Sequence, residues 1–249
     1  DIKILGEEAD NGSIEFDRLS TLTKSTKDIA TKALMLRLKG FSEIKPDNQI
    51  KKALDIRLQS LKGSAKKGTS LTIDCNHFSE TISNLQLDLF STKENILKMT
   101  PMSLVIESFQ NALSDHTEEI DMDKPLLKSL IDFKKNFISK NEIFYLANRG
   151  TIPDVKLTPD MFSKISVLEE NLPKSEKVVI NGQLDEMRFS KNKLGLETTN
   201  GFVNLYAHDK KIMEEILVYM NKEVTITGIA HYRSNGKLSY VEIQEYGQP

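Results

Sequence analysis

Segment 63–70, with the sequence GSAKKGTS, comes closest in this chain to a phosphate-binding loop. In such a loop the glycines let backbone amides approach a phosphate, and a lysine followed by serine or threonine completes the site. Here Thr69 stands where the lysine should be, and the residues from Leu71 onward have the pattern of a strand, not of the helix that holds the phosphates. A flexible hairpin turn with exposed lysines is the favoured interpretation.

Another candidate for chemistry is the acidic segment that contains His116, Glu119, Asp121 and Asp123. Carboxylates and an imidazole together could hold a divalent ion. The glycine and the distant glutamate of a calcium loop are missing after it, so an acidic solvated connector is the simpler interpretation. A metal-dependent hydrolase around His116 and Asp121 is kept as the second alternative function.

No catalytic residue, metal ligand or cofactor site is identified by the sequence. The four histidines lie in neither of the metal-binding spacings HExxH and HxH, and no nucleophile elbow is present. Whether the chain is an enzyme therefore stays open, with a non-catalytic protein favoured.

Recognition by charge has more support. Residues 24–67 contain 12 basic and 4 acidic residues, a net charge of +8 in 44 residues. A face of this sign could attract an acidic protein partner or a phosphate backbone. A solvated helix face followed by a lysine-rich turn explains the same residues.

Aromatic and basic residues also alternate in the last third of the chain, where they could stack on the bases of single-stranded nucleic acid. That part is neutral overall, and core packing explains its aromatic residues equally well. The candidate binding residues of the two regions are Lys24, Lys27, Lys32, Arg37, Lys52, Arg57, Lys62, Lys66, Lys67, Arg188, Phe202, Tyr206, Tyr232 and Arg233.

Composition bounds the class of protein. The 249 residues, 39% hydrophobic and 28% charged, suffice for one large or two modest folded domains. The single cysteine, Cys75, excludes an intramolecular disulfide framework and fits a reducing compartment. Apolar runs of about 18 residues are absent, and no secretory signal pattern is found. We expect a cytoplasmic protein with no membrane span.

Hydrophobic periodicity predicts the elements that position these residues. In the first part we expect a strand at 2–5, a long amphipathic helix over 16–39 that Gly40 ends, and a hairpin of 54–58 with 70–75. Helices over 94–115 and 124–138, a strand at 143–147 and a helix from Thr158 to Leu172 follow. Pro101 is expected to break or kink the first of these helices.

The last 73 residues show the clearest pattern. Alternating segments at 177–189, 193–197 and 202–206 precede a helix over 208–219 and two further strands at 224–230 and 237–246. The order β-β-β-α-β-β is that of an OB-type barrel. Gly182 and Gly228 lie inside strands, where a closed barrel needs bends.

The pieces Gly182-Xaa-Leu184-Asp185 and Gly228-Xaa-Ala230-Xaa-Tyr232, with the helix ATKALMLRLKG and the hairpin edge LQSLKGS, carry a family resemblance. The chain resembles uncharacterised bacterial two-domain proteins with a C-terminal OB-like small β-barrel. The resemblance covers most of the chain thinly and implies its architecture, but no catalytic residue.

Together these observations predict an α+β protein with three parts: an N-terminal helix-plus-hairpin domain at 1–150, a linker and helix at 151–175, and a five-stranded OB-like barrel at 176–249. The favoured function is a non-catalytic interaction or regulatory protein of a bacterial cytoplasmic system that binds a protein partner. The first alternative is single-stranded nucleic-acid binding. The sequence does not specify an oligomeric state.

Overall fold

The computed structural model describes the whole chain except residues 7–11, 44, 65–66, 83–93, 117–120, 149, 151, 190–191 and 249, and the side chains at 64, 94 and 95. The chain divides into two compact units, Asp1–Ile120 with Lys124–Glu170 and Asp121–Asp123 with Asn171–Pro249. Helices and an antiparallel sheet in the first and a closed barrel in the second confirm the predicted α+β class. None of the helices described has the length and apolarity needed to cross a membrane.

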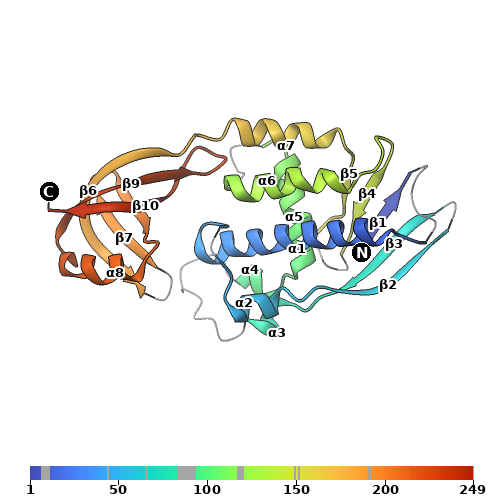
Figure 1. Cartoon of the computed structure of the whole chain (residues 1–249), viewed down its shortest axis with the longest axis horizontal. Coiled ribbons are helices and arrows are strands. Elements are labelled where there is room, and N and C mark those ends of the chain that lie inside the picture. Colours follow the sequence, from blue (N-terminus) through green and yellow to red (C-terminus); the bar gives the residue numbers. More distant parts are fainter. Residues whose placement is uncertain are drawn as a thin grey trace. The chain divides into compact units, whose positions relative to one another are not determined.

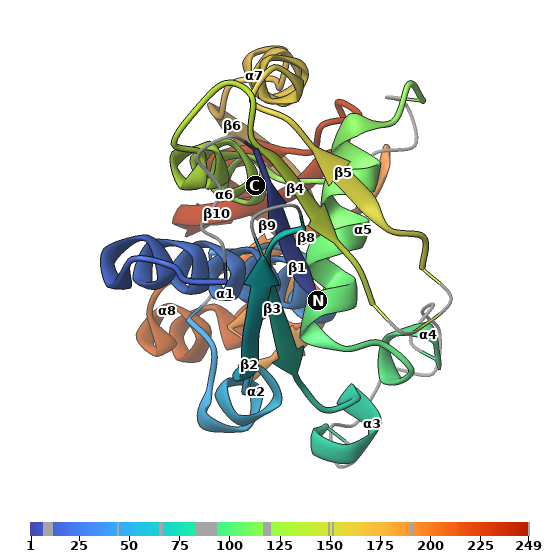
Figure 2. The same ribbon diagram turned by 90° about the vertical axis from the view of Figure 1, so that its right-hand side faces the viewer.

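The first unit contains a five-stranded antiparallel sheet in the order β2-β3-β1-β4-β5, which can be followed in Figure 2. The strand bounds are β1 Ile2–Leu5, β2 Arg57–Ser64, β3 Gly68–Asp74, β4 Ile143–Leu146 and β5 Val155–Leu157. The predicted strand at the start of the chain is thus a central strand, paired with β3 on one side and β4 on the other.

Helices pack against this sheet and against one another (Figure 1). Their bounds are α1 Phe16–Lys39, α2 Asn48–Ala53, α3 Phe78–Thr81, α4 Glu94–Leu97, α5 Pro101–Leu113, α6 Lys124–Asp132 with the 3₁₀ turn η2 Phe133–Asn136, and α7 Met161–Glu170. Helix α1 ends as predicted, with Gly40 in the left-handed conformation at φ 88°. Pro101 does interrupt the predicted helix at 94–115, because it is the first residue of α5 and Thr100 caps that helix.

Four phenylalanines form the centre of the first unit's core. Phe133 contacts Phe109 of α5 at a ring-centroid distance of 5.2 Å, Phe144 of β4 at 5.7 Å and Phe162 of α7 at 6.5 Å. All four side chains are fully buried. Aromatic pairs at these distances add to the free energy of area burial, so this cluster joins the helices to the sheet.

The second unit is a closed barrel in the order β10-β8-β7-β6-β9, the orange and red strands of Figure 1. Its elements are β6 Glu176–Arg188, β7 Lys193–Thr198, β8 Gly201–Tyr206, α8 Lys210–Ile216 with the 3₁₀ turn η4 Leu217–Tyr219, β9 Glu223–Tyr232 and β10 Leu238–Gly247. The predicted order of elements along the chain, with one helix between the third and fourth strands, is confirmed.

Two glycines allow the strands of the barrel to approach closely. A Cβ atom at Gly182 would lie 2.3 Å from the carbonyl oxygen of Glu197, and one at Gly228 would lie 2.2 Å from that of Glu242. Any side chain would push the neighbouring strand away. These are the strand glycines at which the sequence predicts bends.

The hairpin of the first unit is shifted from its predicted position. Residues 48–53 form helix α2, whose cap is Asp47, so the first strand begins at Arg57 rather than at Leu54. A bulge between Leu58 and Ser60 then changes which side chains face inward. The expected linker at 151–175 contains strand β5 and helix α7 of the first unit.

Candidate functional site

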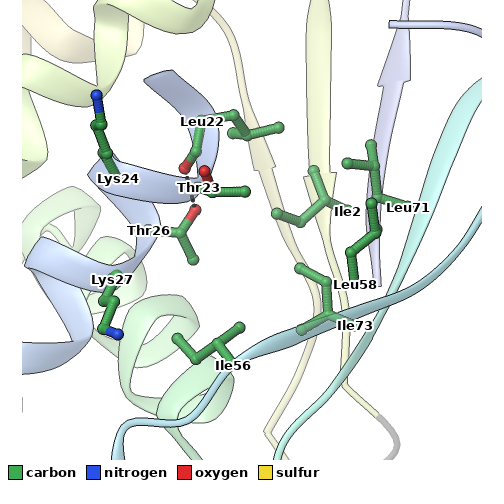
Figure 3. A pocket seen from close by; sticks show the side chains of 10 residues that line it. All are labelled: Ile2, Leu22, Thr23, Lys24, Thr26, Lys27, Ile56, Leu58, Leu71 and Ile73. Atoms are coloured by element: carbon green, nitrogen blue, oxygen red, sulfur yellow. Dashed lines mark hydrogen bonds between the residues drawn. The ribbon is translucent and has the colours of Figure 1, made fainter. Parts of the chain in front are cut away.

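A cavity of about 180 Å³ lies between helix α1 and the sheet of the first unit. Figure 3 shows side chains of α1 on one side and apolar side chains of the sheet on the other. The lining residues are Ile2, Leu22, Thr23, Lys24, Thr26, Lys27, Ile56, Leu58, Leu71 and Ile73. The lining becomes more exposed toward β2: Leu71 is buried, Ile56 and Ile73 are partly buried, and Leu58 is exposed.

Alternation along the strands produces the apolar wall. Ile73 of β3 lies opposite Leu58 of β2, and Leu71 lies opposite Leu61, so these side chains share the inner face of the sheet. On the helix, the Thr26 hydroxyl donates to the carbonyl oxygen of Leu22 at 2.7 Å. That bond uses the hydroxyl proton within the helix, and the Thr23 hydroxyl likewise donates to the carbonyl oxygen of Ser20 at 3.0 Å.

Helix α1 covers the central strands of the sheet but does not extend over the edge strand β2. Ile2 on β1 and Leu71 on β3 are each 1% exposed, whereas Leu58 on the edge strand β2 is 44% exposed. A continuous apolar face of the sheet is therefore left open at β2. The alternation of apolar and charged residues at 54–58 predicts an inward-facing Leu58, but it does not show how far a covering helix extends over the sheet.

Two lysines stand at the helix side of the cavity. Lys24 and Lys27 are exposed, and no described carboxylate forms an ion pair with either of them. In Figure 3 their ammonium groups lie away from the apolar side chains of the sheet. The cavity thus combines an apolar floor with two positive charges at its rim.

The other predicted basic residues of α1 and the hairpin are not gathered at this cavity. Lys32 lies 3.0 Å from Asp28 and 2.6 Å from the hydroxyl of Ser129, and Arg37 lies 2.6 Å from Glu107. Arg57 lies 2.6 Å from Asp55, whose hydrogen bond and charge raise the pKa of the guanidinium. The exposed residues Lys52, Lys62 and Lys67 lie on α2 and the hairpin, and Lys66 lies outside the described residues. Of the predicted residues that the structure describes, only Lys24 and Lys27 line the cavity.

In the barrel the structure brings some of the predicted residues into one row. Register pairing places Arg188 beside Lys193 and Lys193 beside Tyr206, across β6, β7 and β8. Phe202 lies at the other end of β8 and is 51% exposed. Its ring lies against Gly195, where a Cβ atom would be 2.1 Å from the ring.

Three of the predicted barrel residues form hydrogen bonds or ion pairs with acidic side chains. Arg188 pairs with Glu186, and Arg233 lies 3.5 Å from Asp121. Tyr232 packs against the barrel core and donates to Glu176 at 2.6 Å, a hydrogen bond that raises the pKa of the phenol. The positive charge expected beside the aromatic residues is therefore partly neutralised.

Sequence reasoning missed an aromatic and histidine cluster on the barrel. Tyr240 stacks on His231 at 4.4 Å and contacts the ring of Tyr206 edge-on at 6.4 Å. Glu242 accepts from both His208 and His231. These residues come from three separate segments of the barrel, and the pairing of β10 with β8 and β9 brings them together.

The other two candidates for chemistry have no support from the geometry. Segment 63–70 includes the end of β2 and the start of β3, so it leads into a strand and not into the helix of a phosphate-binding loop, and residues 65–66 lie outside the described residues. Within the described part of the chain, no three histidine, cysteine, aspartate or glutamate side chains are grouped to hold a metal ion. His116 is exposed, the carboxylate of Asp121 pairs with Arg233, and Glu119 lies outside the described residues.

Comparison with known proteins adds no relative: no family model, curated protein or solved structure matches this chain.

Proposed function

We propose that the protein is a non-catalytic interaction protein that binds a protein partner in the apolar cavity between α1 and the β2–β3 hairpin. The observation that carries this proposal is the open apolar face at Leu58, 44% exposed, beside the exposed lysines Lys24 and Lys27. The bacterial and cytoplasmic setting stays a prediction from the sequence.

The lining of the cavity supports binding rather than catalysis. Among the described residues that line it there is no carboxylate, imidazole or thiol, and the polar side-chain groups of those residues are two threonine hydroxyls and two ammonium groups. General acid–base chemistry at neutral pH draws mainly on groups of the missing kinds. An apolar floor with charges at the edge is instead the arrangement of a protein-binding pocket.

The size of the cavity suits one or two side chains of a partner. An apolar cavity of roughly 150 Å³ is large enough to bind benzene, so about 180 Å³ accommodates a leucine or phenylalanine side chain. Burial of such a side chain contributes about 1.5–3 kcal/mol. A few anchors of this kind dominate the free energy of many protein interfaces.

The test compares two exposed leucines of similar accessibility. Leu58 lines the cavity and is 44% exposed, whereas Leu217 lies in η4 of the barrel and is 47% exposed. Affinity capture from the lysate of the source cells is expected to recover a partner with the unmodified protein and with Leu217→Glu, but not with Leu58→Glu. Equal recovery by both variants would remove the cavity from consideration.

A second candidate function, single-stranded nucleic-acid binding, is supported by the exposed Phe202 on the outer face of β8. In OB-type barrels the second and third strands bind oligonucleotides, and here these are β7 and β8. Tyr206, on the same strand, and Lys193, its neighbour in register, extend this surface.

A further inference from the structure

The edge strand next to the cavity, β2, has an unpaired outer side, and at its hairpin end Gly12 lies against Gly63. β2 is the outermost strand and pairs with β3 on one side only, and no described strand lies on its other side. An edge strand presents a row of backbone N–H and C=O groups that can pair with another chain. β2 has eight residues and no proline, whereas β5 at the opposite edge has three. The longer edge is therefore the one suited to strand addition.

The cavity lies under this edge. Its floor takes side chains from β1, β3 and β2 in turn, and their exposure increases toward β2. A further strand would lie about 4.8 Å beyond β2, and every second side chain would point to the face that α1 leaves open. Pairing of the backbone and filling of the cavity would then occur in one binding event.

The charges of β2 indicate which strand fits. Arg57 and Lys62 lie opposite Asp74 and Ser70, whereas Leu58 and Leu61 lie opposite Ile73 and Leu71 on the cavity side. The two basic residues therefore project from the outer face. Arg57 is already paired there with Asp55 at 2.6 Å and lies opposite Asp74, whereas Lys62 is exposed and forms no ion pair with a described carboxylate. A side chain directly opposite Lys62 on an added strand is favoured if it is acidic and disfavoured if it is basic. A second copy of β2 would bring its own basic residues there, which argues against self-pairing.

We propose that a partner protein binds as a sixth strand beside β2, through an extended segment in which apolar residues alternate with acidic ones. The apolar residues enter the cavity against Leu58, and the acidic residues lie on the outer face, where one of them faces Lys62. This is strand addition, in which main-chain hydrogen bonds supply affinity and alternate side-chain pockets supply specificity. The inference rests on the proposed function and specifies how the partner is held.

The probe is a fluorescent synthetic peptide of about ten residues, the length of a long strand, that alternates valine or isoleucine with glutamate. Two further peptides carry N-methyl groups on one or the other alternate set of backbone amides. Strand addition predicts that the peptide methylated on the amides that face β2 binds about tenfold or more weakly than the unmethylated peptide. The peptide methylated on the amides that point to solvent should bind almost normally. Amide hydrogen exchange is expected to slow within β2 when the unmethylated peptide binds.

Matched variants identify the site and separate the two proposals. Leu58→Glu is expected to lower the affinity for the unmethylated peptide about tenfold or more, and Leu217→Glu is expected to leave that affinity unchanged. A peptide with lysine in place of glutamate is expected to bind more weakly than the acidic one. Circular dichroism of both variants is the control for correct folding.

Three outcomes would overturn strand addition: no binding of the alternating peptide, equal sensitivity to both methylated sets, or self-association of the protein through β2. If Leu58→Glu still abolishes capture of a partner in any of these cases, the docking cavity stands and only the mode of binding is wrong. Loss of both effects would overturn the proposed function as well.

Discussion

Arg18 and Glu142 form an ion pair in the interior of the first unit. One guanidinium nitrogen of Arg18 lies 2.8 Å from each carboxylate oxygen of Glu142, and the two residues are 7% and 0% exposed. The same nitrogen donates to the carbonyl of Asn136, and the Glu142 carboxylate also accepts from the amide of Ile138 at 2.8 Å. The pair thus ties the first turn of α1 to the chain that enters β4.

Removal of one partner of this pair is expected to destabilise the first unit strongly. Arg18→Met leaves the carboxylate of Glu142 buried and uncompensated, which costs about 3–5 kcal/mol. The double variant Arg18→Met with Glu142→Gln should recover most of that loss, because a neutral amide can still accept from Ile138. Urea denaturation followed by circular dichroism measures both. A single variant that loses less than the double one would contradict this account.

Filling the cavity is expected to oppose binding and to favour folding. Thr26 is 3% exposed and lines the cavity, and its hydroxyl bonds only within α1. Thr26→Leu should raise the free energy of unfolding by about 1 kcal/mol through added apolar burial. The same change should weaken the alternating peptide, as measured by fluorescence anisotropy. A variant that gains stability but binds normally would place the ligand elsewhere.

Tyr246 is expected to ionise at unusually high pH. Its hydroxyl donates to Glu215 at 2.5 Å, and this hydrogen bond is the main cause that raises the pKa of Tyr246 to about 12. The folded state holds the phenol proton more tightly than the unfolded chain, whose tyrosine pKa is about 10. The contribution of this bond to stability is therefore complete below pH of about 10 and is lost as the pH rises toward about 12.

Ultraviolet absorbance titration tests this assignment. Glu215→Gln should shift the titration of Tyr246 toward its ordinary value, because the amide carries no charge, and Tyr246→Phe should remove that step from the curve. An unchanged tyrosine titration in Glu215→Gln would show that Glu215 is not the cause.

Phe202 provides the test of nucleic-acid binding. Stacking of a base on an aromatic side chain is worth about 1–3 kcal/mol, so Phe202→Ala should weaken a fluorescent single-stranded oligonucleotide about fivefold or more. The affinity of the unmodified protein should also fall as salt is added. Val179→Ala, at a β6 residue that is 65% exposed, is the control and should bind normally. Absence of salt-dependent binding by the unmodified protein would eliminate this function.

The spacing of apolar residues was sufficient to predict the long helix and the barrel strands, because their apolar residues recur at regular intervals along the chain. α1 was predicted over its full length because its apolar positions recur at helical spacing and Gly40 ends it. The barrel was predicted because short alternating strands with tight turns leave few other topologies. The hairpin was displaced because Asp47, whose side chain accepts from the amide of Ile50 at 2.9 Å, begins the short helix α2 that the strand pattern concealed.

The candidate site depends on contacts that no local pattern contains. Lys27 and Lys32 both belong to the basic stretch, yet Lys32 contacts Ser129, 97 residues away, and Lys27 lines the cavity. Arg37 contacts Glu107 in the same way, across the packing of α1 on α5. Tertiary packing decides which basic side chains form ion pairs and which stay free to bind a partner. The sequence therefore predicts a basic face but does not show which of its residues are already paired.

The barrel is closed by a short parallel seam between β8 and β10, with Leu205 beside Val241 and Tyr206 beside Glu242. During synthesis on the ribosome the meander of β6, β7 and β8 emerges first, and its apolar inner surface has no cover until β9 and β10 follow. Pairing between segments so distant in sequence forms late and slowly, and an uncovered strand edge at this stage invites aggregation. Closure of the barrel therefore depends on β10, which pairs with both β8 and β9.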